Sequence, residues 1–380
     1  GHGCGHNLLG TGALAGALAL KDYLEATGQP GTVVYFGTPA EENLSGKAFM
    51  ARDGAFDGVD FFLTWHPAPE NRTATPHLNA NVCRTYKFKG ITSHAGGAPE
   101  LGRSALDSCE IMGVGANYLR EHVIMEARIH YAYLDVGGRA PNVVQDHAAV
   151  RYVVRAPYYR QVKEIVPRLD DVARGAALIC GTQVTVERES GYSEYINNQV
   201  LAQAATEAFH AIGVPKWDDR DFALAKAFTD SFSDSMKEKE EQTILKRYGR
   251  DRLEEKLAQP LDTEIKDFDP DREELDFGST DVGDVGFIAP TYYFNVATEA
   301  MGTPGHSWYK TGQVNSSIGQ KGMLTAGKVI ALTPPWRRAT YNELCEEKGG
   351  ADWFQLTPEE RIKRGQELKL DVHAGMSDLD

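Results

Sequence analysis

Three short runs of apolar residues, rich in β-branched and aromatic side chains, stand out along the chain. They occupy residues 32–38, 59–65 and 290–296. Short, nearly continuous apolar runs are typical of parallel strands that are buried on both faces. Helical stretches lie between them at 8–24, where Asn7 is expected as the N-cap, and at 198–212. Strands that alternate with helices predict an α/β fold.

The middle of the chain, residues 82–190, follows a different pattern. We expect strands at 82–89, 128–135, 148–155 and 183–188, and helices at 101–120 and 159–178. Polar and apolar residues alternate in the first and last of these strands, which is typical of an antiparallel sheet with one solvated face. The order β-α-β-β-α-β is that of a ferredoxin-like domain, so we interpret this segment as a second domain inserted into the first.

The resulting prediction is an α/β protein built from four segments. Residues 1–81 and 191–336 form the two parts of one α/β/α domain, 82–190 form the inserted α+β domain, and 337–380 form a helical tail. Within the second part, residues 218–274 are dense in charge and are expected to form a solvated helical excursion. In the tail, Thr357 followed by Pro358 is typical of a helix start.

The 380-residue chain has a formal net charge of −14, which disfavours nucleic acids and anionic membranes as partners because an acidic surface repels phosphate groups. Its five cysteines are widely spaced and include no Cys-x-x-Cys pair, so we expect no disulfide framework and a cytoplasmic protein. No apolar run reaches the roughly 20 residues that span a bilayer. The chain starts at Gly1, directly on its densest motif, and we therefore expect that an N-terminal segment is missing from this sequence.

Side chains that can bind metals follow each of the three predicted strands and also lie in the opening loop. They are Glu41 and Glu42, His66, His306, and the pair Cys4 and His6. Ligands of open α/β sheets gather at the carboxyl ends of the strands, so these groups are expected to meet. Thiol, imidazole and carboxylate are the ligands of a zinc-like site. One catalytic metal needs only three protein ligands, so five candidates indicate two metals, with Glu41 left as a candidate general base.

Each of these groups also has an ordinary interpretation. A Cys-x-His pair can arise by chance, adjacent glutamates usually form a solvated surface pair, and His66 or His306 could be a simple loop residue. Their combination at the predicted strand ends favours the metal site. The glycines of the opening run also suggest a phosphate site of a nucleotide-dependent oxidoreductase. Their spacing is Gly-x-Gly-x-Gly, however, and no Gly-Lys-Ser/Thr follows, which argues against a nucleotide.

Five motifs occur in the order seen in the M20 metallopeptidase family, which the chain resembles. They are Gly3-Cys4-Gly5-His6-Asn7, Pro39-Ala40-Glu41-Glu42, Trp65-His66, Ser93-His94-Ala95-Gly96 and Gly305-His306. The cysteine in the first motif is similar to the amidohydrolase branch of that family, and the opening run 1–10 and the segment 278–285 resemble the aminobenzoyl-glutamate hydrolases within it. The resemblance covers residues 1 to about 335 and implies a metal-binding α/β domain with an inserted ferredoxin-like lid.

The resemblance also implies roles for the metal-binding candidates. Two divalent ions, Zn²⁺ or Mn²⁺, would be bridged by Cys4, with His6 and His66 on one ion and Glu42 and His306 on the other. Glu41 would be the general base.

In the lid, His94 would reach the active site of the partner in a homodimer and stabilise the oxyanion, while Asn142 and Arg155 would bind the substrate carboxylate. The implied reaction is hydrolysis of the amide that joins an acyl or aroyl group to an amino acid, as in aminobenzoyl-glutamate. The alternative is an inactive homologue that serves as a binding or partner subunit.

Overall fold

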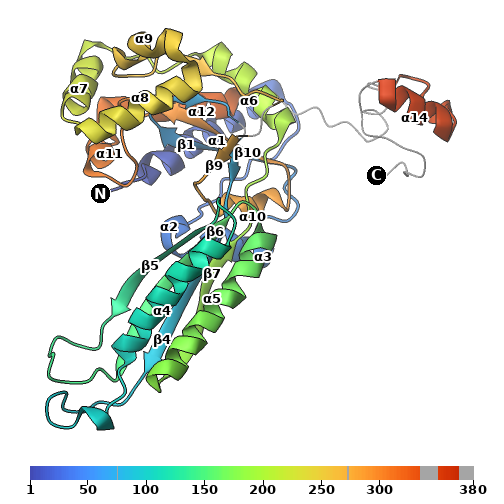
Figure 1. The fold of residues 1–380 in the computed structure, drawn as a ribbon. Coiled ribbons are helices and arrows are strands. Elements are labelled where there is room, and N and C mark those ends of the chain that lie inside the picture. The colour runs from blue at the N-terminus through green and yellow to red at the C-terminus, as the bar shows by residue number, and fades with distance from the viewer. Residues whose placement is uncertain (75, 272–273, 334–349, 368–380) are drawn as a thin grey trace. The chain divides into compact units, whose positions relative to one another are not determined.

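The computed structural model describes residues 1–74, 76–271, 274–333 and 350–367 of the chain. Two compact units, Gly1–Thr333 and Pro334–Asp380, are described separately. The first unit combines helices with β-sheets, which confirms the α/β class predicted from the sequence (Figure 1). In the described residues, no helix is both long enough and apolar enough to cross a membrane. The cysteines in these residues, Cys4, Cys83, Cys109 and Cys180, are free thiols.

The first sheet has the strand order β1-β10-β2-β8. Its strands are β1 (Phe62–Ala68), β10 (Thr291–Ala297), β2 (Asn71–Arg72) and β8 (Ile265–Lys266). β1 and β10 are parallel, with Trp65 opposite Phe294, and both of these side chains are 1% exposed. The parallel strands predicted at 59–65 and 290–296 are therefore confirmed, although β1 begins and ends closer to the C-terminus than predicted and most of its residues are half-buried rather than buried.

Helices cover this pair of strands. They are α1 (His6–Thr27), α6 (Gln199–Ile212) and α12 (Ser317–Leu332), and each contacts β1 or β10. The predicted helices at 8–24 and 198–212 are confirmed, and Asn198 caps the second by accepting a hydrogen bond from Leu201 N at 2.9 Å. Shorter elements complete this part: α2 (Glu41–Leu44), α3 (Gly46–Arg52), α10 (Val282–Gly286), α11 (Trp308–Gln313), and the paired strands β3 (Pro76–Leu78) and β9 (Glu274–Asp276).

Two local predictions are wrong. Residues 32–38 form no strand, and Val34 and Tyr35 are 53% and 45% exposed. A strand needs a neighbouring backbone to satisfy its hydrogen bonds, and the described residues supply none for this run. Asn7 is not the N-cap of α1, because the helix already begins at His6 and the cap is Gly5 in the left-handed conformation. The Asn7 side chain instead donates to Val314 O at 3.4 Å.

The second sheet, in the middle of the chain, has the strand order β5-β6-β4-β7, and all of its neighbours are antiparallel. Its strands are β4 (Ala80–Lys89), β5 (Arg128–Asp135), β6 (His147–Ala156) and β7 (Gln183–Tyr192), and its helices are α4 (Ala105–Leu119) and α5 (Tyr159–Cys180), with short 3₁₀ turns at Pro99–Leu101 and Arg120–His122. Alternate residues of β4 and β6, such as Tyr86 and Tyr152, pack with Met112 and Leu169 of the two helices in one core. The sequence of strands and helices predicted for 82–190 is therefore observed.

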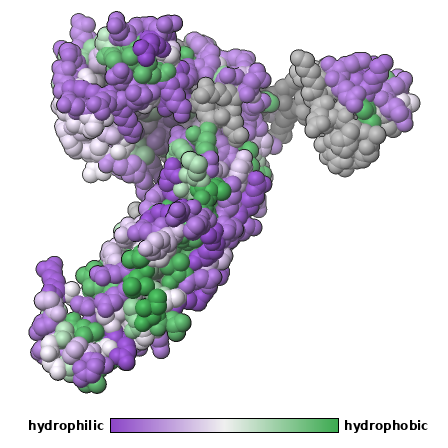
Figure 2. Space-filling view, viewed as in Figure 1, coloured by the Kyte–Doolittle hydropathy of each residue, from purple (hydrophilic) through white to green (hydrophobic). Residues whose placement is uncertain are grey.

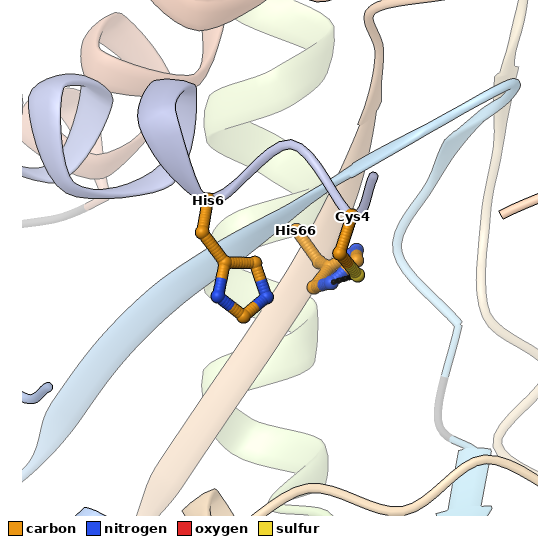
Figure 3. A group of neighbouring side chains, drawn as sticks. All are labelled: Cys4, His6 and His66. Atoms are coloured by element: carbon orange, nitrogen blue, oxygen red, sulfur yellow. Dashed lines mark hydrogen bonds between the residues drawn. The ribbon is translucent and has the colours of Figure 1, made fainter. Parts of the chain in front are cut away.

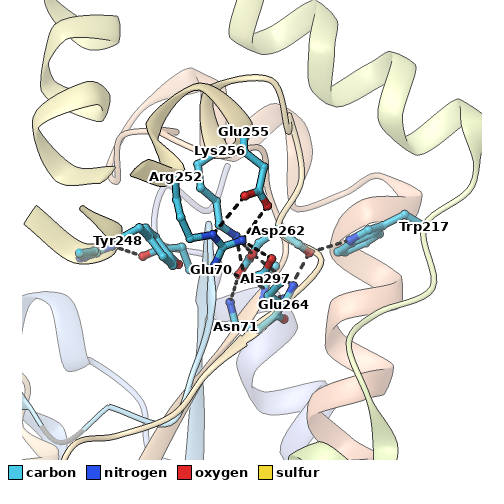
Figure 4. Close-up of polar contacts among 11 residues, drawn as sticks. Glu70, Asn71, Trp217, Tyr248, Arg252, Glu255, Lys256, Asp262, Glu264 and Ala297 are labelled. Carbon is cyan, nitrogen blue, oxygen red and sulfur yellow. Dashed lines mark hydrogen bonds and ion pairs between the residues drawn. The ribbon is translucent and has the colours of Figure 1, made fainter. Parts of the chain in front are cut away.

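The charged segment 218–274 is helical from Asp219 to Leu257, as predicted, but its later residues contribute strand β8, and several of its charges are buried. It contains α7 (Asp219–Asp230), α8 (Asp234–Tyr248), the 3₁₀ turn Arg250–Arg252 and α9 (Leu253–Leu257). Lys256 and Asp262 are each 1% exposed, with 3.6 Å between the ammonium and the carboxylate (Figure 4). Asp262 also accepts the backbone N–H of Asn71 at 2.8 Å, and Tyr248 donates to Glu70 at 2.9 Å. These contacts fix the excursion to the residues that follow β1.

The second unit contains the 3₁₀ turn Trp353–Gln355 and helix α14 (Pro358–Glu367). The helix start predicted at Thr357 is confirmed, because Thr357 Oγ1 accepts Glu360 N at 3.3 Å while the Glu360 carboxylate accepts Thr357 N at 2.8 Å. The remainder of the predicted helical tail, 337–349 and 368–380, lies outside the described residues.

Candidate metal centre

The loop that carries Cys4 and His6 is shaped by the glycine between them. Gly5 has φ 84°, a left-handed conformation that residues with a Cβ rarely adopt. A Cβ at this position would also lie 2.9 Å from Pro67 Cβ, so the loop can only approach the end of β1 with glycine here. Trp65 Nε1, on β1, donates to the carbonyl oxygen of Leu9 in the first turn of α1 at 2.9 Å, and this bond ties α1 to β1. The loop before α1 is thereby held beside His66.

His66 lies where β1 passes the Cys4 loop (Figure 3). Its Nε2 is 3.4 Å from Cys4 Sγ, and its Nδ1 is 2.8 Å from Pro67 O. A carbonyl oxygen can only accept, so Nδ1 carries the hydrogen of this bond. The Nε2 of the neutral ring then presents its lone pair toward Cys4. The rings of His66 and His6 are perpendicular, with centroids 6.0 Å apart.

His306 reaches the same place from the loop after β10. Its backbone N–H donates to Gly3 O at 2.8 Å, and a Cβ on Gly3 would lie 3.2 Å from the His306 Cα. Glycine at position 3 therefore allows the two loops to touch. The His306 side chain is 67% exposed, and its Nε2 is 3.7 Å from Glu42 Oε2.

The two adjacent glutamates lie at the start of α2 and both approach His6. His6 Nε2 is 3.8 Å from Glu41 Oε2 and 3.6 Å from Glu42 Oε1. The Glu42 side chain is 41% exposed, whereas that of Glu41 is 19% exposed. Burial, together with the negative charge of Asp281, raises the pKa of Glu41 to about 7. A carboxyl group with such a pKa can both accept and release a proton near neutral pH.

All six residues predicted at the metal site are brought together. Their donor atoms form three groups within 4.8 Å: Cys4, His6 and His66; Cys4, Glu42 and His306; and His6, Glu41 and Glu42. Cys4 is common to the first two groups, which together contain all five predicted ligands. A thiol, imidazoles and carboxylates aimed at one space are a donor set that fits divalent metal ions.

The electrostatic environment suits metal ligation. Burial, followed by the charge of Lys310, lowers the pKa of His66 to about 3, and burial also lowers the pKa of His6. Both rings are therefore neutral at pH 7, which is the form that binds metal. Burial raises the pKa of the Cys4 thiol to about 12, and the charge of Lys310 opposes this rise. Metal binding at Cys4 must therefore displace a proton.

The three residues predicted in the lid lie apart from this cluster in the contacts that the described residues make. His94 is exposed, and its Nδ1 accepts from Gly97 N at 2.9 Å. The loop of His94 pairs with that of Asn142, because Ala95 N donates to Asn142 O at 3.0 Å. Arg155 lies on β6, and in the described part of the chain its buried Nε has no hydrogen-bond partner.

Two ion pairs around the site were not predicted from the sequence. Lys47 Nζ is 2.8 Å from Asp281 Oδ1, and Asp281 is fully buried. Lys310 Nζ is 3.0 Å from Glu299 Oε1, and both residues are almost fully buried. Glu299 could have been found, because it follows β10 as closely as Glu41 follows the apolar run at 32–38. The two lysines give no such signal.

Similar proteins point to one family. One of the subunits of the p-aminobenzoyl-glutamate hydrolase of Escherichia coli (strain K12) is 41% identical over 336 residues, which are 88% of this chain and 70% of that protein. The Xaa-Arg dipeptidase of Mus musculus is 29% identical over 338 residues, which are 88% of this chain and 66% of that protein.

The fold and the sequence profile agree with these relatives. The aminobenzoyl-glutamate utilization protein from Klebsiella pneumoniae has a similar fold, with a TM-score of 0.54 at 18% identity over 86% of this chain and 68% of that chain. The profile of peptidase family M20/M25/M40 matches residues 1–233. The chain therefore belongs to peptidase family M20/M25/M40, and it is a hydrolase of amide bonds.

Proposed function

We propose that the protein is a metal-dependent amidohydrolase that releases an amino acid from its N-acyl or N-aroyl derivative, with p-aminobenzoyl-glutamate as the first candidate substrate. One observation supports this most strongly: six side chains from four separate segments converge, and two of the three donor groups share Cys4. The name of the 41% identical relative supports the choice of substrate. An inactive homologue finds no support, because the ligand set is complete and the similar proteins are named as hydrolases and a dipeptidase.

In this proposal Cys4 would be the ligand shared by two divalent ions, Zn²⁺ or Mn²⁺, with His6 and His66 completing one donor group and Glu42 and His306 completing the other. When bound, such ions polarise the scissile carbonyl and make water a better nucleophile at neutral pH. Glu41 then takes the proton of the attacking water and delivers it to the leaving amine. Its pKa of about 7 and its position beside His6 suit both steps.

The substrate carboxylate is proposed to bind Arg155 and Asn142. The buried Nε of Arg155 has no hydrogen-bond partner among the described residues, and a guanidinium binds a carboxylate through two parallel hydrogen bonds. Burial raises the pKa of Tyr192 on β7, and the charges of Arg155 and Glu41 act on that pKa in opposite directions. The amino-acid end of the substrate would then extend from the metal centre toward β6.

The segment from β4 to β7 is proposed to act as a ferredoxin-like lid and as the contact of a homodimer, with His94 of one subunit stabilising the oxyanion in the other. β5 is an edge strand, and seven of its eight residues are exposed. On α4, Val114 and Tyr118 are 52% and 70% exposed, and hydrophobic surface gathers around α4 (Figure 2). An unpaired strand edge beside apolar side chains is a suitable surface for a second copy.

The metal centre is tested by removing its proposed bridge. We expect the full chain to hydrolyse p-aminobenzoyl-glutamate after loading with Zn²⁺ or Mn²⁺ and to lose this activity after chelation. Cys4→Ala should lower the metal content measured by elemental analysis, because two donor groups lose their shared thiol. Cys109→Ala, which removes a thiol buried in α4, is the matched control and should retain the metal. Full metal content in Cys4→Ala would exclude Cys4 from the centre.

A further inference from the structure

Lys310 is a buried cation that the proposed reaction does not use. It lies on α11, one helical turn after His306, and is 4% exposed. Its ammonium forms an ion pair of 3.0 Å with Glu299 Oε1, on the loop that follows β10. Glu299 is 1% exposed. Buried charges are costly to desolvate, so a pair beside a functional site calls for an explanation beyond stability.

The Lys310 ammonium also donates to Pro67 O at 3.0 Å. The same oxygen lies 2.8 Å from His66 Nδ1, which must donate to it. A carbonyl oxygen has two lone pairs, and here one is directed at the imidazole and the other at the ammonium. Lys310 therefore fixes the direction of the carbonyl that orients the His66 ring.

The Lys310 stem also supports the loop that carries Cys4 and His6. A Cβ on Gly5 would lie 3.4 Å from Lys310 Cε and 2.9 Å from Pro67 Cβ. Gly5 thus rests on the lysine stem and on the proline whose carbonyl the lysine binds. One side chain accordingly contacts both segments that carry the ligands of the first donor group, the loop of Cys4 and His6 and the strand β1 with His66.

The helix of Lys310 is itself firmly held. Gln313, fully buried on the next turn of α11, accepts Ala300 N at 2.7 Å and donates to Thr303 Oγ1 at 3.0 Å. These bonds hold the loop between Glu299 and His306. The ion pair of Lys310 with Glu299 and the hydrogen bonds of Gln313 together fix α11 relative to the loop that leads from Glu299 to His306.

We propose that Lys310, held by Glu299, is a positioning residue of the metal centre that keeps the His66 ring in its Nδ1–H tautomer and in register with the Cys4–His6 loop. This inference rests on the proposed metal-dependent function. Partners that fix the tautomer of a metal-binding histidine typically contribute a factor of about 10–100 to metal affinity.

The test removes both charges while keeping the side-chain volumes. Lys310→Met/Glu299→Gln leaves no unpaired buried charge, which a single substitution would do. The matched control is Lys256→Met/Asp262→Asn, which removes the buried pair of the charged excursion, and this pair contacts neither Pro67 nor Gly5 among the described residues (Figure 4). Co²⁺ is titrated into each metal-free full chain, and its thiolate charge-transfer band reports binding at Cys4. Ring ¹⁵N shifts of histidine-labelled, metal-free protein report the His66 tautomer.

We expect Lys310→Met/Glu299→Gln to bind Co²⁺ about 10–100-fold more weakly and to lose the pure Nδ1–H tautomer of His66. The control variant should show the wild-type affinity for Co²⁺ and the wild-type tautomer of His66, even if its melting temperature falls as much as that of Lys310→Met/Glu299→Gln. Unchanged affinity and tautomer in the first variant would overturn the inference, and so would an equal weakening in the control. Wild-type protein that binds no Co²⁺ would instead contradict the metal centre, and Lys310 would then have no ligand to position.

Discussion

Glu41 and Glu42 are neighbours in the sequence but differ in their surroundings. Glu42 approaches both His6 and His306, whereas Glu41 is the less exposed of the two and lies near the charge of Asp281. A ligand must present its carboxylate to the metals, while a base must change its protonation during the reaction. These surroundings support the proposal that Glu42 binds metal and that Glu41 transfers the proton.

Glu41→Gln separates these two roles. We expect turnover to fall by about 10²–10⁴-fold, because an amide of the same shape cannot accept the proton. The metal content, measured on the same preparation, should remain that of wild type. Near-normal turnover would contradict the assignment of the base. Loss of metal would instead make Glu41 a ligand.

The pH dependence of the reaction supplies an independent check. The proposed reaction requires deprotonated Glu41, so kcat/KM should fall as the pH falls through the pKa of this group. Asp281 raises that pKa by its negative charge, and Lys47 lowers it. Asp281→Asn removes the charge that raises the pKa of Glu41 and leaves Lys47, which lowers it, without its partner. The pKa of Glu41 should therefore fall, and the acidic limb of the kcat/KM profile should move to lower pH.

Asp284→Asn provides the matched control for this shift. Asp284 lies on the same short helix, α10, and burial raises its pKa as well, but it bonds Ser193. Its removal should leave the acidic limb in place. Two outcomes would contradict a role for Glu41 as the titrating base. One is an acidic limb that moves to higher pH in Asp281→Asn, and the other is a limb that moves equally in both variants.

Among the elements, α1 and α12 are packed through glycines. A Cβ on Gly16 would lie 2.7 Å from Ile330 Cγ2 and 3.0 Å from Gly327 O, so there is no room for a methyl group. We expect Gly16→Ala to lower the free energy of unfolding by about 1–3 kcal/mol, because overpacking forces the helices apart. Since α1 carries the Cys4–His6 loop, metal affinity should fall with it.

Gly175→Ala is the corresponding control, because a Cβ there meets nothing within 4 Å inside helix α5. It should raise the free energy of unfolding by about 0.5–1 kcal/mol, since alanine loses less backbone entropy than glycine in a helix. Urea unfolding of both variants measures the difference. Destabilisation of the same size in both would show that the loss in Gly16→Ala does not come from the close helix contact.

The strands of the first sheet show how much of the fold the sequence could predict. Apolar runs at 59–65 and 290–296 predict the parallel strands β1 and β10, because apolar side chains on both faces suit a strand that is covered on both sides, and the side chains at the strand ends supply the ligand candidates. The run at 32–38 has the same pattern but forms no strand, because pairing depends on a neighbour that the local sequence does not encode. The pair Lys310 and Glu299 is invisible for a similar reason: burial of a charge depends on tertiary packing.

At the scale of the whole molecule, the proposed homodimer makes each active site depend on two subunits. His94 is exposed and makes no contact with the Cys4 cluster among the contacts of the described residues, although the family motif carries it. If it acts in the partner subunit, a subunit with defective His94 still has an intact Glu41, and the reverse holds for a subunit with defective Glu41. The two defects can then compensate in a mixed dimer.

We therefore expect His94→Ala and Glu41→Gln to be nearly inactive alone and to recover activity when they are mixed and allowed to exchange subunits. Random exchange makes half of the dimers mixed, and each mixed dimer has one complete site of two, so recovery should approach about a quarter of the wild-type rate. Mixing Glu41→Gln with Cys4→Ala is the control, since both defects lie in the same site and should not compensate. The contrary outcome is a mixture of His94→Ala and Glu41→Gln that shows no more activity than the two variants measured separately. That result would place His94 in the site of its own subunit or outside the reaction.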